Sequence, residues 1–69
     1  MKTYDSVNLG KNVRMARRVK ELSQTKLAEV VKVTTPTISA IENGKAVPRA
    51  DVLFMICEVL DINVETIFD

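Results

Sequence analysis

The stretch of residues 23–44 restricts the fold of this chain more than any other, because it predicts two short helices joined by a tight turn. Ser23 is placed to cap the first helix, about 24–31, by accepting a hydrogen bond from an otherwise unpaired backbone N–H group. Thr34 is placed to cap the second helix, about 35–43, in the same way. The sequence therefore places a pair of short, capped helices in the middle of the chain.

The second helix of this pair has two faces of different character. Ile38 and Ile41 form a narrow apolar seam that suits a core. The opposite face carries small side chains without formal charge, namely Thr35, Pro36, Thr37, Ser39, Ala40 and Asn43. A solvated helix face usually carries Lys and Glu, so this one favours close contact with another surface. A helix in the major groove of DNA fits that description, and so does an ordinary small-residue face packed on another helix.

The length of 69 residues and the apolar content of 46% predict one small globular domain. No interior stretch alternates at period two, so we expect an all-α fold without a sheet. Besides the central pair, the patterns predict helices over about 7–20 and 50–60 and a last short helix over about 64–68. Residues 1–6 are expected to form a short arm, and 7–69 the domain.

Several classes of protein are disfavoured by what the sequence lacks. With one cysteine and no histidine, we expect no internal disulfide, no protein-built zinc site and no cofactor. There is no phosphate-binding glycine-rich loop and no nucleophile beside a base, so an enzyme is not expected. No apolar run approaches the ~18 residues of a membrane span, which favours a cytoplasmic protein without a membrane partner.

The charges are unevenly distributed, although the formal net charge is only +1. Residues 50–69 contain five acidic side chains and no basic one. Residues 1–20 contain one acidic side chain and six basic ones: Lys2, Lys11, Arg14, Arg17, Arg18 and Lys20. A basic front of this kind suits phosphate groups, whereas the acidic tail should point away from them.

Arg17 falls on the inward face of the first helix, two turns beyond Leu9. A charged residue in that position is usually paired, and Glu42 near the end of the third helix is its expected partner. The alternative is a solvated arginine.

The helix over about 50–60 is apolar most of the way round, which indicates that it is buried on more than one side. A 69-residue chain cannot easily cover such a helix by itself, so we expect a homodimer. The alternative is that some of these residues close the core of their own chain. The expected dimer surface consists of Val52, Met55, Val59, Ile62, Val64, Ile67 and Phe68.

Together these residues resemble the Cro/CI-type (XRE) helix-turn-helix family of repressors over about residues 8–68. The resemblance rests on Leu9-Gly10, Arg17, Leu22-Ser23-Gln24, Leu27-Ala28, Val33-Thr34, Thr37-Ile38-Ser39, Ile41-Glu42-Asn43-Gly44, Pro48, Leu53, Ile56 and Leu60. It implies a compact five-helix, lambda-repressor-like domain that binds double-stranded DNA. It further implies a repressor-like regulator that binds an inverted repeat as a homodimer.

The resemblance also implies roles for single residues. The recognition helix, about 35–43, would read bases through Thr35, Pro36, Thr37, Ser39 and Ala40. Phosphate contacts would come from Gln24, Thr37, Asn43, Lys45 and Arg49, and more weakly from Arg14 on the exposed side of the first helix. For Gln24 the resemblance implies either a contact with a phosphate or a contact that braces the recognition helix. Arg17 and Glu42 match a buried ion pair of the family.

The sequence departs from the family at three turns where glycine is common, because those positions hold Glu21, Lys32 and Asp61. If the backbone stays left-handed there, each residue costs on the order of 1 kcal/mol relative to glycine. The base-reading positions also lack the Gln and Arg that make bidentate contacts with bases.

Two other functions fit the same residues. An antitoxin of a toxin–antitoxin pair would bind DNA in the same way and use its apolar tail to bind a toxin. A protein-interaction module would keep the fold without binding DNA.

Overall fold

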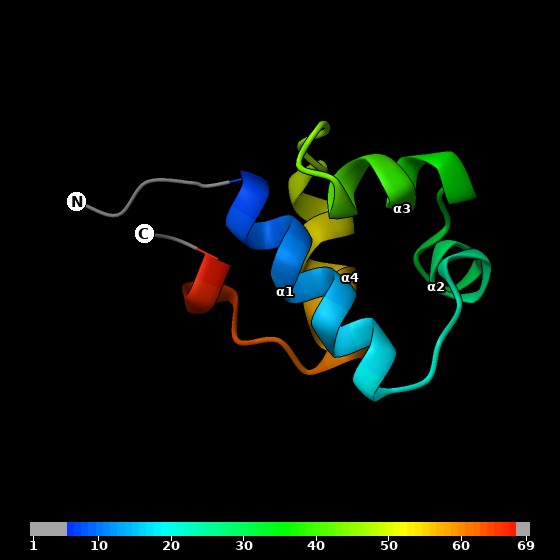
Figure 1. The fold of residues 1–69 in the computed structure, drawn as a ribbon, viewed down its shortest axis with the longest axis horizontal. Coiled ribbons are helices and arrows are strands. Elements are labelled where there is room, and N and C mark those ends of the chain that lie inside the picture. Colours follow the sequence, from blue (N-terminus) through cyan, green and yellow to red (C-terminus); the bar gives the residue numbers. More distant parts are fainter. Residues whose placement is uncertain (1–5, 68–69) are drawn as a thin grey trace.

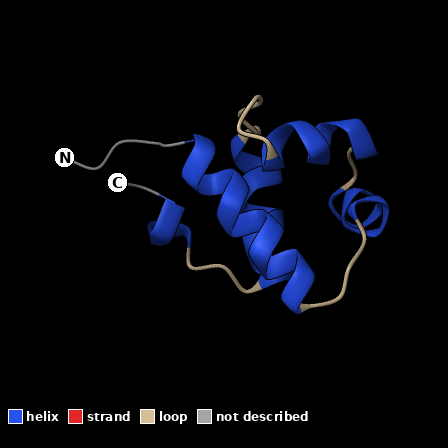
Figure 2. Ribbon diagram, in the orientation of Figure 1, coloured by secondary structure: helices blue, strands red, loops and turns tan. Residues whose placement is uncertain are grey.

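The protein is described here by a computed structural model that covers residues 6–67. Four α-helices follow one another along the chain, and a short 3₁₀-helix, η1, ends the described part (Figure 1). Their bounds are α1 Ser6–Val19, α2 Gln24–Val31, α3 Thr35–Glu42, α4 Ala50–Leu60 and η1 Val64–Ile67. Within this range only helices and connecting loops occur, as Figure 2 shows, which confirms the all-α class.

The helix bounds agree closely with those that the sequence predicts, because the predicted caps form. The Ser23 side chain accepts a hydrogen bond from the Lys26 backbone N–H at 2.9 Å, and α2 begins directly after it. Thr34 caps α3 through the Thr37 N–H at 3.3 Å. The last predicted helix differs, since η1 is a single 3₁₀ turn and not an α-helix.

Three helix ends turn in the left-handed conformation although no glycine stands there. The φ angles are 56° at Glu21, 62° at Lys32 and 56° at Asp61. At Lys32 the turn is fixed by backbone hydrogen bonds, including one of 2.9 Å from the Val33 N–H to the Ala28 carbonyl. The chain therefore keeps the turn geometry for which glycine is best suited and bears the steric cost of a side chain at each position.

The core lies between α1, α2, α3 and α4. Its fully buried side chains come from every one of these helices: Leu9, Val13, Leu27, Val31, Ile38, Ile41 and Ile56. α1 approaches the end of α3 so closely at Gly10 that a Cβ atom there would lie 2.6 Å from the carbonyl oxygens of Ile41 and Glu42. Gly10 is therefore required by the packing of α1 on α3.

Part of the apolar surface of α4 is only half-buried in the single chain. Val52, Met55 and Val59 pack against the edge of the core, and so do Ile62 and Val64 from the tail. The chain itself thus covers part of the surface for which the sequence suggests a second copy. Of the other residues expected in the dimer surface, Ile67 has no described side chain and Phe68 lies outside the described residues.

Residues 1–5 of the predicted arm also lie outside the described range. Ser6 belongs to α1, which begins and ends one residue earlier than predicted. None of the described helices combines the length and hydropathy that a membrane span needs.

Candidate nucleic-acid interface

α2 and α3 are joined by a short turn and pack on one another and on the rest of the domain (Figure 1). Ile38 and Ile41 are fully buried and hold one side of α3 against the core. The residues predicted to read bases lie on the other side, where Pro36 is exposed and the rest are half-exposed. We call this the groove face, and it consists of Thr35, Pro36, Thr37, Ser39 and Ala40.

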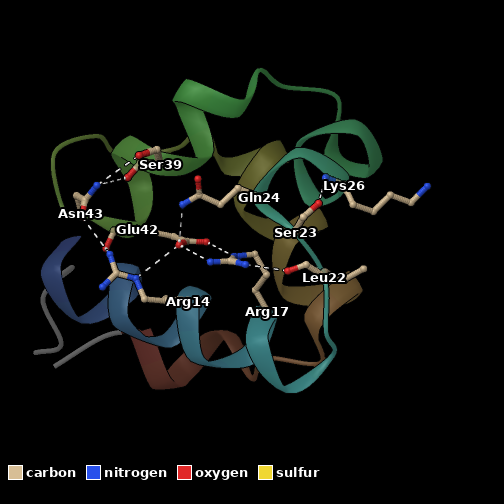
Figure 3. Close-up of polar contacts among 9 residues, drawn as sticks. All are labelled: Arg14, Arg17, Leu22, Ser23, Gln24, Lys26, Ser39, Glu42 and Asn43. Carbon is tan, nitrogen blue, oxygen red and sulfur yellow. Dashed lines mark hydrogen bonds and ion pairs between the residues drawn. The ribbon is translucent and has the colours of Figure 1, made fainter.

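The last turn of α3 is anchored by a buried carboxylate. Glu42 is only 4% exposed, and its side chain receives polar groups from three directions (Figure 3). Arg17 donates from Nε to Glu42 Oε2 at 2.6 Å and from Nη2 to Oε1 at 3.1 Å. Gln24 Nε2 donates to Glu42 Oε1 at 3.1 Å. The ion pair that the spacing of Arg17 and Glu42 predicts is therefore present and links α1 with α3, while Gln24 links α2 to the same group.

The environment of Glu42 keeps it ionised. Burial acts to raise the pKa of its carboxyl group, but the hydrogen bonds from Arg17 and Gln24 and the positive charges of Arg17 and Arg14 outweigh that effect. The net result is a pKa below the ordinary glutamate value. Arg17 also donates to the Leu22 carbonyl at 2.8 Å, so its guanidinium has partners on two sides.

Arg14 is partly exposed, as the sequence predicts, but its side chain also turns toward the end of α3. Its Nη2 atom donates to Asn43 Oδ1 at 3.0 Å, and its Nε atom lies 3.6 Å from Glu42 Oε1 (Figure 3). Asn43 in turn donates from Nδ2 to the Ser39 carbonyl at 2.9 Å. Arg14 is three residues before Arg17, on the same face of a helix, so helical spacing was a signal for this contact that sequence reasoning missed.

The positive side chains in the loop after α3 are exposed to solvent and do not belong to the core. Lys45 and Arg49 are both exposed, in the loop that leads from α3 to α4. Arg49 Nε lies 3.4 Å from Asp51 Oδ1, but both side chains are largely solvated. An exposed pair of this kind contributes little energy and is easily exchanged for a phosphate partner.

No other candidate site emerges from the described part of the chain. Residues 6–67 contain no group of three acidic, histidine or cysteine side chains placed to hold a metal ion. No pocket is found in that range either. Cys57 is buried in the core, and burial raises the pKa of its thiol. It is therefore a packing residue, as its apolar neighbours in the sequence predict.

Comparison with known proteins identifies the helix–turn–helix arrangement. The sequence profile of the helix-turn-helix family matches residues 13–67. YgzD, an uncharacterized HTH-type transcriptional regulator from Bacillus subtilis (strain 168), is 40% identical over an alignment of 60 residues, and the match covers 78% of this chain and 91% of that protein.

Solved structures show the same fold. Two crystal structures of the clp gene regulator ClgR from Corynebacterium glutamicum superpose on 97% of this chain with TM-scores of 0.83 and 0.82. They share 24% sequence identity with it, and the match covers 71% and 86% of those chains. This chain therefore belongs to the helix-turn-helix family of DNA-binding transcriptional regulators, in agreement with its resemblance to the Cro/CI type.

Proposed function

We propose that this protein is a repressor-like regulator that binds an inverted-repeat operator as a homodimer, with α3 in the major groove. The observation that carries the proposal is the construction of α3. Its inner side is fixed by buried isoleucines and by the Glu42 contacts, while its groove face is small, uncharged and accessible. A rigid helix with such a face can approach base edges closely.

The residues around α3 supply phosphate ligands in this proposal. Lys45 and Arg49 contact phosphates beyond the end of the helix, because they are exposed and positively charged. Asn43 is held by Arg14 and Ser39 and offers a fixed polar group at the same end. Gln24 already braces Glu42 through one N–H of its amide nitrogen, so the second N–H is the donor left for a phosphate.

Thr37 and Arg14 complete the proposed phosphate set. Thr37 lies in the first turn of α3, at the positive end of the helix dipole, which favours an anion. Arg14 has a side chain that is 39% exposed, so it reaches solvent beside Asn43 while it contacts Glu42. A phosphate at this corner would meet Arg14 and Asn43 together.

The homodimer is proposed from the half-buried apolar residues of α4 and the tail. Val52, Met55 and Val59 are only partly covered by their own chain, and Phe54 between them is 59% exposed. A second copy packed on this surface would cover them. Two recognition helices about 34 Å apart would then read half-sites whose centres are ~10 bp apart.

Selection of binding sites from a random pool of double-stranded DNA, at about physiological salt, tests the proposal. The expected result is an inverted repeat with half-site centres ~10 bp apart. A single asymmetric site would contradict the dimer. Enrichment of no motif would contradict sequence-specific binding, and the search would turn to protein partners of α4.

The exposure of Phe54 favours one second candidate, an antitoxin whose α4 binds a toxin while α3 binds DNA. Purification of the protein from its native cells distinguishes the two. A different protein present in equal molar amount would support the antitoxin, whereas homodimers alone would support the regulator.

A further inference from the structure

Each hydroxyl on the groove face already has a partner within the protein. Thr35 donates from Oγ1 to Thr25 Oγ1 at 3.3 Å. The Oγ1 atoms of Thr37 and Thr34 lie 2.8 Å apart and share a hydrogen bond. The Ser39 hydroxyl accepts from Asn43 Nδ2 at 3.4 Å. Each hydroxyl group of this face thus already makes one hydrogen bond within the protein.

What the groove face offers outward is mostly hydrocarbon. Thr35 and Thr37 each carry a methyl group, the side chain of Ala40 is one, and Pro36 is an exposed apolar ring. The face has no guanidinium, amide or carboxylate group that would pair with the polar edge of a base. In the major groove, the group that such an apolar surface can contact favourably is the C5-methyl group of thymine.

We propose that this protein reads the C5-methyl groups of pyrimidines through the groove face of α3. The proposal rests on the proposed function, because it requires α3 to lie in the major groove. Beyond the proposed function, it identifies the chemical group of the DNA that α3 recognises in the major groove. 5-Methylcytosine carries its methyl group at the same ring position as thymine, so the protein should also bind more tightly to a methylated cytosine than to an unmethylated one at a contacted position.

The size of the effect follows from the removal of one methyl group from water. Burial of one such group is equivalent to about a fourfold change in affinity for each methyl contacted. A half-site with two contacted methyl groups should therefore lose roughly 15-fold when both are removed.

The test uses synthetic duplexes of the selected operator, with one thymine at a time replaced by uracil, at constant salt. Uracil keeps the pairing, the phosphates and every polar atom, and it lacks only the methyl group. The expected result is about fourfold weaker binding at each contacted position. At the same positions, duplexes with 5-methylcytosine should bind better than duplexes with cytosine by a similar factor.

Two protein variants at each threonine separate the methyl from the hydroxyl group. Thr35→Ser and Thr37→Ser keep the hydroxyl and remove the methyl, so the preference for thymine over uracil should disappear at the position beneath. Thr35→Val and Thr37→Val keep the methyl group and replace the hydroxyl with a second methyl group, so the preference should remain.

Several outcomes overturn the proposal. Equal binding of thymine and uracil duplexes at every position would overturn it and leave the proposed function intact. A preference that is kept by the serine variants and lost by the valine variants would assign recognition to the hydroxyl groups. A selection that recovers no operator at all would overturn both proposals.

Discussion

Glu42 is the residue on which the polar contacts of α1, α2 and α3 converge. Its carboxylate is buried, yet Arg17 and Gln24 satisfy it directly and Arg14 adds positive charge nearby. A buried charge with this many partners is costly to disturb, because removing it leaves the guanidinium of Arg17 without compensation. The end of α3, and with it the placement of Asn43, depends on this one side chain.

Replacing Glu42 with glutamine should lower the free energy of unfolding at neutral pH by about 3 kcal/mol, since Arg17 would remain buried beside an uncharged amide. Because the pKa of Glu42 is depressed in the folded state, its contribution to stability is present above the ordinary pKa of 4.5. That contribution is lost as the pH falls through the folded pKa, because the unfolded chain takes up the proton first.

The measurement is urea denaturation of both proteins between about pH 7 and about pH 3. The difference in unfolding free energy between the wild type and Glu42→Gln should shrink below pH 4.5. A difference that stays constant over this range would show that the charge of Glu42 does not contribute in the way described.

Replacing Gly10 with alanine should destabilise the domain by about 1–3 kcal/mol, because the new Cβ would meet two backbone carbonyl oxygens of α3. Backbone cannot yield as a flexible side chain does, so α1 would have to move away from α3. Thermal denaturation checks this, with Lys11→Ala as the control at the neighbouring exposed position. The control should change stability by less than about 0.5 kcal/mol, and an equally small change for Gly10→Ala would contradict the close approach.

At the scale of elements, the residues at the helix ends decide where each helix begins and how the chain turns after it. Ser23 and Thr34 start α2 and α3 with side-chain hydrogen bonds, whereas α2 and α4 end on the left-handed residues Lys32 and Asp61. Local backbone hydrogen bonds, such as those from the Val33 N–H to the Ala28 carbonyl and from the Ile62 N–H to the Cys57 carbonyl, hold these two ends in a geometry that their side chains disfavour. The turn between α2 and α3 connects the two helices of the helix-turn-helix, so Lys32 is the residue at which to measure the cost.

Lys32→Gly should stabilise the protein by up to about 1 kcal/mol, because glycine removes the steric cost of the left-handed turn. Lys26→Gly is the matched control, since Lys26 is an exposed lysine inside α2. There the same change should destabilise by about 1 kcal/mol. Urea denaturation of both variants measures the two changes in stability. A loss of stability in both would mean that the lysine at position 32 makes a compensating contact.

At the scale of the whole molecule, the basic side chains are found mainly in the first half of the chain and the acidic ones toward its end. Lys20 at the end of α1 pairs with Asp61 after α4, with 2.8 Å between Nζ and Oδ2. Lys45 and Arg49, in contrast, have no close partner in the core and extend from the loop after α3. Lys20 therefore has a structural partner, whereas Lys45 and Arg49 are the exposed positive residues that we propose contact phosphates.

Lys45→Ala and Arg49→Ala should each reduce the slope of log affinity against log salt concentration by about 0.9 per protomer, because each removes one phosphate contact. Lys20→Ala removes the same charge elsewhere and should leave the slope unchanged. Fluorescence anisotropy with the selected operator, over a series of salt concentrations, provides the measurement. Unchanged slopes for both loop variants would remove Lys45 and Arg49 from the phosphate contacts.

Sedimentation at tens of micromolar tests the dimer, which should have twice the 7.7 kDa mass of one chain. Phe54→Ser changes an exposed residue of α4 and should shift the equilibrium toward monomer without loss of the fold. A wild type that stays monomeric at this concentration would contradict a dimer formed in the absence of DNA.

Much of the fold is determined by local properties of the sequence. Local signals fix where α2 and α3 begin and end, because each depends on neighbours a few residues away. These signals are the caps Ser23 and Thr34, the 3.6-residue spacing of the core residues, and Gly44, which adopts a left-handed conformation just after α3. The Arg17–Glu42 pair also followed from spacing, since a charge on an inward face needs a partner.

Only the tertiary structure decided the features that depend on two distant segments. The clash that excludes a side chain at Gly10 arises from the α3 backbone some thirty residues later. Arg14 turns toward Asn43, and the hydroxyl groups of the groove face find partners at its edge, only once α1, α2 and α3 are packed together. The structure also showed that Glu21, Lys32 and Asp61 keep left-handed turns, in which the backbone hydrogen bonds that close each helix end outweigh the local preference of a residue with a Cβ atom.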